Sequence, residues 1–293
     1  MGVLMLAGDI IFGAGKKILH GIISKNYLNN LADYYFGNGI MFLFMSLIFL
    51  PFALFDPFPS WKLITLAILN GFGNVLFQVF CSRAMNVGSV SLTVLITSFS
   101  LIPPILFSLF VMNEELHIFQ IVGFALLAVT FFLVVKPDKE TRVNLLWLLF
   151  VGIAYTASSV CGIIGKLRVY WVNDESINWY LVIGTAFSAG MALLLGRSAE
   201  QRQSLQLSFR LVSRATLMMF ACAAVLAINN ICYTYCNTLI PGTILFPIGN
   251  GGIMVLTMAV SALIFREKLS RRQWIGIVTG VISMLLICNV ISI

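Results

Sequence analysis

One short motif occurs twice in this chain, each time between two long apolar runs. The copies are residues 114–123 and 267–276, and they are 153 residues apart. The shared positions are Glu114, Leu116, Gln120 and Gly123 in the first copy, and Glu267, Leu269, Gln273 and Gly276 in the second. A motif that closes each half of a hydrophobic sequence predicts a membrane protein built from two structural repeats.

The composition supports a membrane protein and excludes an ordinary soluble domain. Hydrophobic residues make up 60% of the chain and charged residues 10%. A helix needs roughly 20 apolar residues to cross a bilayer core of about 30 Å. The sequence predicts spans at residues 2–23, 37–54, 64–84, 91–111, 119–135, 145–165, 177–196, 215–236, 243–265 and 274–291. The loops between them leave no room for a separate catalytic or nucleic-acid-binding domain.

The net charge of +7 is read as a topology signal, because Lys and Arg accumulate in cytoplasmic loops. Loops after odd-numbered spans carry Lys25, Arg83, Lys136, Lys139, Arg142, Arg197, Arg202, Arg210, Arg214, Arg266, Lys268, Arg271 and Arg272, whereas loops after even-numbered spans carry Lys62, Lys166 and Arg168. The odd loops are therefore predicted to be cytoplasmic, with both termini outside. Five spans in each repeat then place the two halves in opposite orientations.

The predicted division is a first repeat at residues 1–136, a linker at 137–143 and a second repeat at 144–293. A charged, proline-containing stretch marks the linker. The motif at the end of each half resembles the drug/metabolite transporter superfamily, in its ten-helix EamA-type branch. The resemblance implies an all-α integral membrane fold, with ten transmembrane helices in two inverted five-helix repeats. It also implies a central cavity surrounded by the first, third and fourth helices of each half.

Ionisable groups inside a span are functional candidates because burying them in lipid costs a few kcal/mol or more. In the first span, Asp9, Lys16 and His20 fall on one helical face. Lys16 could bind an anionic substrate group, and Asp9 or His20 could titrate during transport. Alternatively, Lys16 and Lys17 extend to the nearby membrane surface while Asp9 caps an outer interface.

Amide side chains form a second set of candidates. Asn74 and Gln78 follow Asn70 at helical spacing in the third span, and Asn230 and Tyr233 occupy the corresponding span of the second half. Such groups either line an aqueous cavity or join helices through hydrogen bonds of about 1 kcal/mol.

Further polar positions complete the predicted substrate-binding set. Thr97 and Asn250 are equivalent in the two repeats, and Tyr155 belongs to a polar patch in the sixth span. The full set is Asp9, Lys16, Asn74, Gln78, Thr97, Tyr155, Asn230, Tyr233 and Asn250. Glu114 and Glu267 are predicted to cap the helices that follow them and not to be catalytic.

These features together predict a secondary transporter of a small organic solute, such as a metabolite, amino acid or drug, that works by alternating access. The alternatives are a non-transporting assembly or anchoring subunit and a membrane-embedded enzyme. The six cysteines form no metal or redox motif, and no ATP-binding P-loop is present. No catalytic residue, metal or cofactor is therefore expected. The expected partners are the solute and the lipid bilayer, and no nucleic acid is expected. The protein is expected to be a monomer or a homodimer and to lie in the cytoplasmic (inner) membrane.

Overall fold

The computed structural model of the protein describes residues 2–27, 31–87, 93, 96–97, 99–134, 145–203, 214–264 and 270–287. All elements within these ranges are helices. They are α1 (Gly2–Tyr27), α2 (Leu31–Ala53), α3 (Trp61–Val87), the 3-10 helix η1 (Phe99–Leu101), α5 (Ile102–Val111), α6 (Ile118–Val134), α7 (Leu145–Val172), α8 (Ile177–Gln203), α9 (Arg214–Leu239), α10 (Gly242–Ile264) and α11 (Arg271–Ile287). The predicted all-α fold class is confirmed, and each predicted span has a helical counterpart among the described residues. The predicted linker lies outside them.

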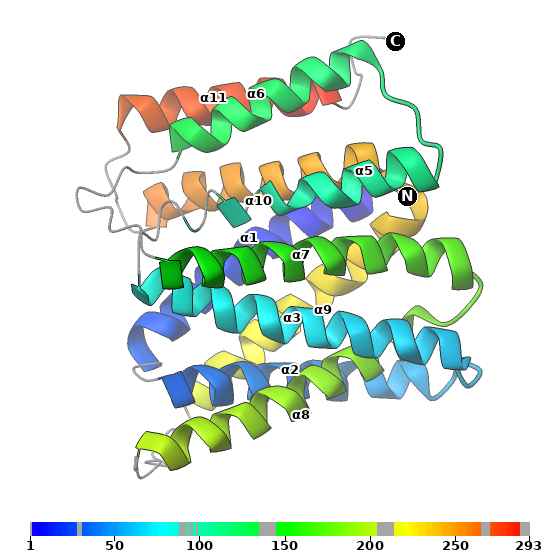
Figure 1. Cartoon of the computed structure of the whole chain (residues 1–293), viewed down its shortest axis with the longest axis vertical. Helices are drawn as coiled ribbons and strands as arrows, with labels where there is room; N and C mark the ends of the chain where they lie inside the picture. Colours follow the sequence, from blue (N-terminus) through cyan, green and yellow to red (C-terminus); the bar gives the residue numbers. More distant parts are fainter. Residues whose placement is uncertain are drawn as a thin grey trace.

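The helices pair across the two halves of the chain (Figure 1). α6 lies beside α11 at one edge of the bundle, α2 lies beside α8 at the other, and the remaining helices lie between. Contacts between α1 and α9 are matched by contacts between α7 and α3, and those between α1 and α10 by those between α7 and α5. Exchanging the halves thus converts one pairing into the other, as expected for two repeats related by a two-fold axis.

Five of the described helices are long and apolar enough to cross a membrane by length and composition alone. The qualifying stretches are Ala32–Ala53, Trp61–Cys81, Leu145–Val172, Ile177–Ala199 and Leu217–Leu239. Shorter apolar stretches occur at Phe99–Val111, Ile118–Leu133 and Gly242–Thr257. Many large apolar side chains remain exposed on the outside of the bundle, Phe110 and Leu145 among them, as a lipid-facing surface requires.

The predicted end of the sixth span was wrong in a way that affects the site. α7 continues seven residues past Gly165, to Val172. Lys166 and Arg168 are therefore helix residues with buried side chains and not members of an even-numbered loop. Lys62, which stays exposed at the start of α3, is the remaining loop-side member of that group.

Glycines bring α3 and α8 into close contact near the centre of the bundle. A Cβ atom added at Gly71 would lie 2.4 Å from the carbonyl oxygen of Gly184. The hydroxyl of Ser188 donates to the Gly71 carbonyl at 3.1 Å. Small residues at membrane helix interfaces allow this approach, and van der Waals contact and interhelical hydrogen bonds then stabilise the pair.

We predict that Gly71→Ala lowers the unfolding free energy by about 1–3 kcal/mol, because the new methyl group collides with backbone and not with a movable side chain. Gly190→Ala in α8 is the matched control, since nothing lies within 4 Å of its added Cβ. Thermal unfolding of the two purified variants in detergent measures their stabilities. Equal melting temperatures for the two variants would show that the α3–α8 contact is not tight.

Candidate functional site

A cavity of about 260 Å³ lies between helices of both halves, bounded by α1, α2, α3, α7, α8, α9 and α10 together with η1 and α5. Its polar lining from the first half comprises Asp9, Lys16, Asn70, Asn74, Gln78 and Ser100. The second half contributes polar side chains that include Arg168, Tyr180, Asn229, Asn230, Tyr233 and Asn250. Concave sites with a few convergent polar groups are the usual sites of small-molecule binding.

Most of the predicted substrate-binding residues meet in this cavity. The residues that line it are Asp9, Lys16, Asn74, Gln78, Asn230, Tyr233 and Asn250. Thr97 and Tyr155 do not. The Thr97 hydroxyl donates to the Thr93 carbonyl of its own segment at 2.8 Å. Tyr155 lies one helical turn before Ser158, the lining residue nearest the start of α7, and is therefore beyond the end of the cavity.

Asp9 joins the two halves at the cavity wall. Its side chain is 2% exposed, and Asn229 Nδ2 donates to its Oδ1 at 2.7 Å and to its backbone carbonyl at 3.0 Å. Lys16 lines the cavity on the same helix, whereas Lys17 is exposed. The two members of the predicted α1 stripe whose side chains are described, Asp9 and Lys16, thus both line the cavity. The side chain of His20 lies outside the described residues.

Two amide side chains line the cavity and also bond to carbonyls of their own helices. Asn250 lines the cavity and also donates from Nδ2 to the Phe246 carbonyl at 2.9 Å. Asn237 likewise lines the cavity and donates to the Tyr233 carbonyl at 3.0 Å. Part of each amide is therefore engaged with its own helix, while the cavity can hydrate or bind the rest.

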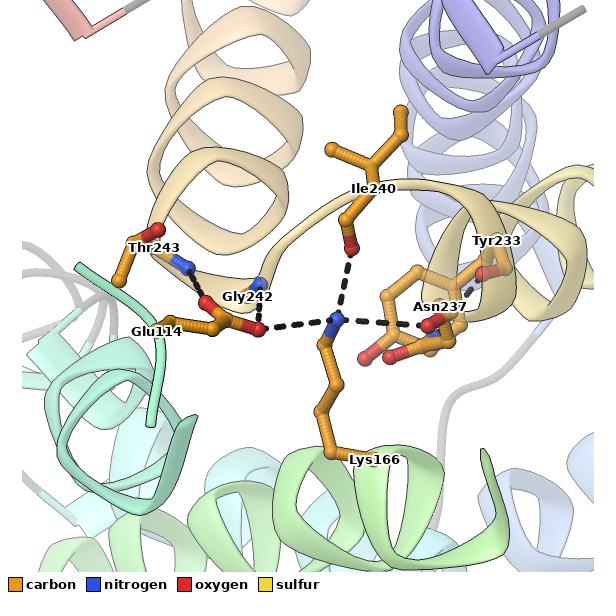
Figure 2. Close-up of polar contacts among 7 residues, drawn as sticks. All are labelled: Glu114, Lys166, Tyr233, Asn237, Ile240, Gly242 and Thr243. Carbon is orange, nitrogen blue, oxygen red and sulfur yellow. Dashed lines mark hydrogen bonds and ion pairs between the residues drawn. The ribbon is translucent and has the colours of Figure 1, made fainter. Parts of the chain in front are cut away.

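Glu114 caps a helix, as predicted, but the helix belongs to the other half of the chain (Figure 2). Its two carboxylate oxygens accept hydrogen bonds from the backbone N–H groups of Gly242 at 2.8 Å and Thr243 at 2.9 Å, at the start of α10. The prediction that Glu114 caps the next helix, α6, was wrong. Asn113 has φ 53°, and this left-handed residue turns the chain after α5 back toward α10.

Lys166 completes this contact between Glu114 and the turn from α9 to α10. Its Nζ donates to the carbonyls of Ile240 at 2.7 Å and Asn237 at 3.3 Å, and lies 3.7 Å from Glu114 Oε1. The lysine thus meets the last carbonyls of α9, and the glutamate meets the first N–H groups of α10. Both charges complement the helix dipoles at these ends.

A second set of polar contacts joins the halves at the same end of the bundle (Figure 1). Asp56, in the α2–α3 turn, accepts from Ser176 Oγ at 2.5 Å and from Asn178 Nδ2 at 2.9 Å. These two hydrogen bonds hold the pKa of Asp56 below its usual value, so the carboxylate stays ionised at neutral pH. In return, Glu175 accepts from the backbone N–H of Ser60 at 2.8 Å, at the start of α3. This end is formed by the turns that follow the even-numbered predicted spans, at residues 54–60, 112–117, 173–176 and 240–241. We refer to it as the even-turn end.

The other motif residues have structural roles as well. Gln120 Oε1 accepts from the His117 N–H at 2.9 Å and caps α6, and Gln273 Oε1 accepts from the Ser270 N–H at 3.0 Å before α11. A Cβ at Gly123 would lie 2.6 Å from Ile287, where α6 packs against α11. Glu267 and Leu269 lie outside the described residues.

Sequence reasoning missed several lining residues of the second half. Arg168 was assigned to a loop because the sixth span was predicted to end at Gly165, just before the first charged residue, Lys166. Tyr180, Thr185 and Ser188 carry no charge and looked like ordinary members of an apolar helix. One sequence signal could have found two of them: Thr185 and Ser188 are three residues apart, so their polar side chains fall on one side of α8.

The fold and the cavity define a polytopic membrane protein with a polar site between its two halves. Residues 18–136 match the EamA-like transporter family. A solved structure titled only "Crystal structure of protein" has a TM-score of 0.73 and 12% sequence identity, over 99% of this chain and 96% of that chain. At this identity the likeness shows the fold alone. No curated protein sequence matches the chain.

Residues 18–136, less than half of the chain, are similar to the EamA-like transporter family, which belongs to the drug/metabolite transporter superfamily.

We predict that Glu114→Ala lowers the unfolding free energy by about 2 kcal/mol, because it removes two bonds to helix N–H groups and the ionic partner of buried Lys166. Glu115→Ala changes an exposed neighbour in the same turn and should leave stability unchanged. Thermal unfolding in detergent compares them. If both alanine variants melt together with the wild type, Glu114 does not hold α10.

Proposed function

We propose that the protein is a secondary transporter that carries a small polar organic solute across the cytoplasmic membrane by alternating access. The observation that carries this proposal is the polar cavity between equivalent helices of the two halves. In transporters built from inverted repeats, the substrate binds at the repeat interface, and one half rocks against the other around the bound solute.

The contacts at the even-turn end support this mechanism. There the halves are joined by hydrogen bonds and one ion pair, through Glu114, Lys166, Asp56 and Glu175. Polar contacts near the membrane surface can exchange protein partners for water when the halves separate, at lower cost than a packed apolar core. With the predicted orientation, this end faces outside. Opening it would require the Glu114 and Asp56 contacts to break.

The proposed partners follow from the same features. The solute occupies the cavity, and the exposed apolar outer surface contacts the bilayer. The protein acts as a monomer or a homodimer.

Reconstitution into liposomes tests the function. Purified protein is screened by thermal shift against amino acids, sugars, nucleotide derivatives and organic cations, because a ligand that binds the folded state raises its melting temperature. Each compound that binds is then followed as radiolabelled uptake into liposomes with and without protein. Uptake of no compound would favour the non-transporting subunit.

We predict that Asn74→Ala, Gln78→Leu and Asn250→Leu each weaken solute binding by about 2–10-fold, since each removes one cavity hydrogen bond of about 0.5–1.5 kcal/mol. Expression and melting temperature should change little, because apolar replacements are mild in a bilayer. Tyr155→Phe is the control, since this residue lies beyond the cavity. Wild-type affinity in all three cavity variants would show that the solute binds elsewhere.

Asp9 is the residue that we propose couples transport to protons, if transport is proton-linked. It is the one acid among the described residues that line the cavity. We predict that Asp9→Asn abolishes the pH dependence of net uptake but retains solute exchange, because exchange moves no net proton. Asp174→Asn, at an exposed acid of the even-turn end, serves as the control. A wild-type pH profile in Asp9→Asn would indicate facilitated diffusion or exchange.

A further inference from the structure

Arg168 is a fully buried cation without a hydrogen-bond partner among the described residues. Its side chain is 0% exposed, and Nε, Nη1 and Nη2 have no hydrogen-bond acceptor in the part of the chain that the structure describes. Burying a charge in this way is strongly unfavourable unless a partner compensates it. Lys166, two residues earlier, shows the contrast, since its Nζ has two carbonyls and Glu114.

An aromatic contact orients the Arg168 guanidinium without using its donors. Its Cζ lies 5.7 Å from the centroid of the Tyr180 ring. A cation above an aromatic face is attracted to the ring, but this contact occupies the face of the guanidinium and not its N–H edge. That edge is a rigid planar fork, which matches the two oxygens of a carboxylate or phosphate.

Both Arg168 and Tyr180 belong to the cavity wall. The other charged residues of the described lining are Asp9 and Lys16. Asp9 already accepts from Asn229 at 2.7 Å, and the lining as a whole carries two cations and one acid. The cavity therefore has one positive charge in excess, and its least compensated cation is Arg168.

We infer that Arg168 binds the anionic group of the transported solute, which is a small organic carboxylate or phosphate ester. This inference rests on the proposed transport function and adds the chemical class of the substrate. Tyr180 positions the guanidinium, and the solute's anion supplies the acceptors that Arg168 lacks within the described protein. The remaining lining amides, such as Asn74 and Asn230, are then available to the uncharged part of the solute.

Thermal-shift titration of the purified full-length protein tests the assignment with matched pairs of solutes. One arm compares succinate with succinamide, and a second compares glycerol 3-phosphate with glycerol. Further small carboxylates and phosphate esters extend each arm, and putrescine represents cations. We expect at least one acid to bind while its uncharged counterpart does not. The arm that contains it identifies carboxylate or phosphate as the preferred group.

Variants at position 168 then assign the binding to this side chain. Arg168→Gln should weaken binding of the acid by at least about tenfold, because hydrogen bonds to a charged group are lost. Arg168→Lys keeps the charge but not the planar fork, so it should bind more tightly than Arg168→Gln and less tightly than the wild type. Arg83→Gln is the control, since Arg83 also lies about 6.0 Å from aromatic rings but does not line the cavity.

Stability without solute gives an independent readout. If Arg168 is kept for a ligand, Arg168→Met removes an uncompensated charge, and its melting temperature should equal or exceed that of the wild type. A lower melting temperature together with unchanged acid binding would make Arg168 a structural residue and overturn the inference.

Two further results would overturn it and differ in their consequences. Binding and uptake of uncharged or cationic solutes alone would refute an anionic substrate and leave the transport function intact. Binding and uptake of none of the compounds would refute both proposals.

Discussion

The structure depends on one constraint, that a polar group within a membrane protein must find its partner inside the protein. The turn from α9 to α10 shows how this is met. The helix ends there expose carbonyls and N–H groups that no helix can satisfy internally. Lys166 donates to the carbonyls at the end of α9, and Glu114 accepts from the N–H groups at the start of α10 (Figure 2). Since Glu114 comes from the first half, satisfying these groups also ties the two halves together.

The same constraint explains why the halves enclose a cavity. Glycines such as Gly71 and Gly184 bring α3 and α8 into backbone contact, while Asp9 and Asn229 join α1 to α9 through hydrogen bonds. Between these close contacts, polar side chains from both halves line the cavity. Polar groups at this depth are tolerated where they line a space that holds water or a solute. A site at the interface of two halves can be exposed on either side of the membrane by a small relative motion, which is why such an interface suits transport.

Much of the fold was predictable because membrane spans are defined by length and apolarity, which are properties of the sequence. The duplicated motif predicted two repeats, and the polar faces of the first and third spans led to Asp9, Lys16, Asn74 and Gln78. Thr97 and Tyr155 do not line the cavity, for a physical reason. Helical spacing gives the direction of a side chain around its own helix, but it does not give the depth at which a neighbouring helix ends the cavity. The partner of Glu114 was also unpredictable, since a carboxylate in a turn can reach any helix start that folding brings near it.

The pair Lys166 and Arg168 separates what the sequence determined from what the tertiary structure decided. The sequence determined that two cations lie near the end of the sixth apolar run, and that charges so placed are costly unless solvated or paired. The sequence could not distinguish the two cations, because they lie two positions apart and charged residues after an apolar run usually belong to a loop. In the folded protein α7 continues past both. Lys166 points to the carbonyl end of α9 and to Glu114, whereas Arg168 lies against the Tyr180 ring at the cavity wall, and its donors have no acceptor among the described residues. Only the packing of helices distant in sequence decides which buried charge is satisfied within the protein and which is left to a ligand.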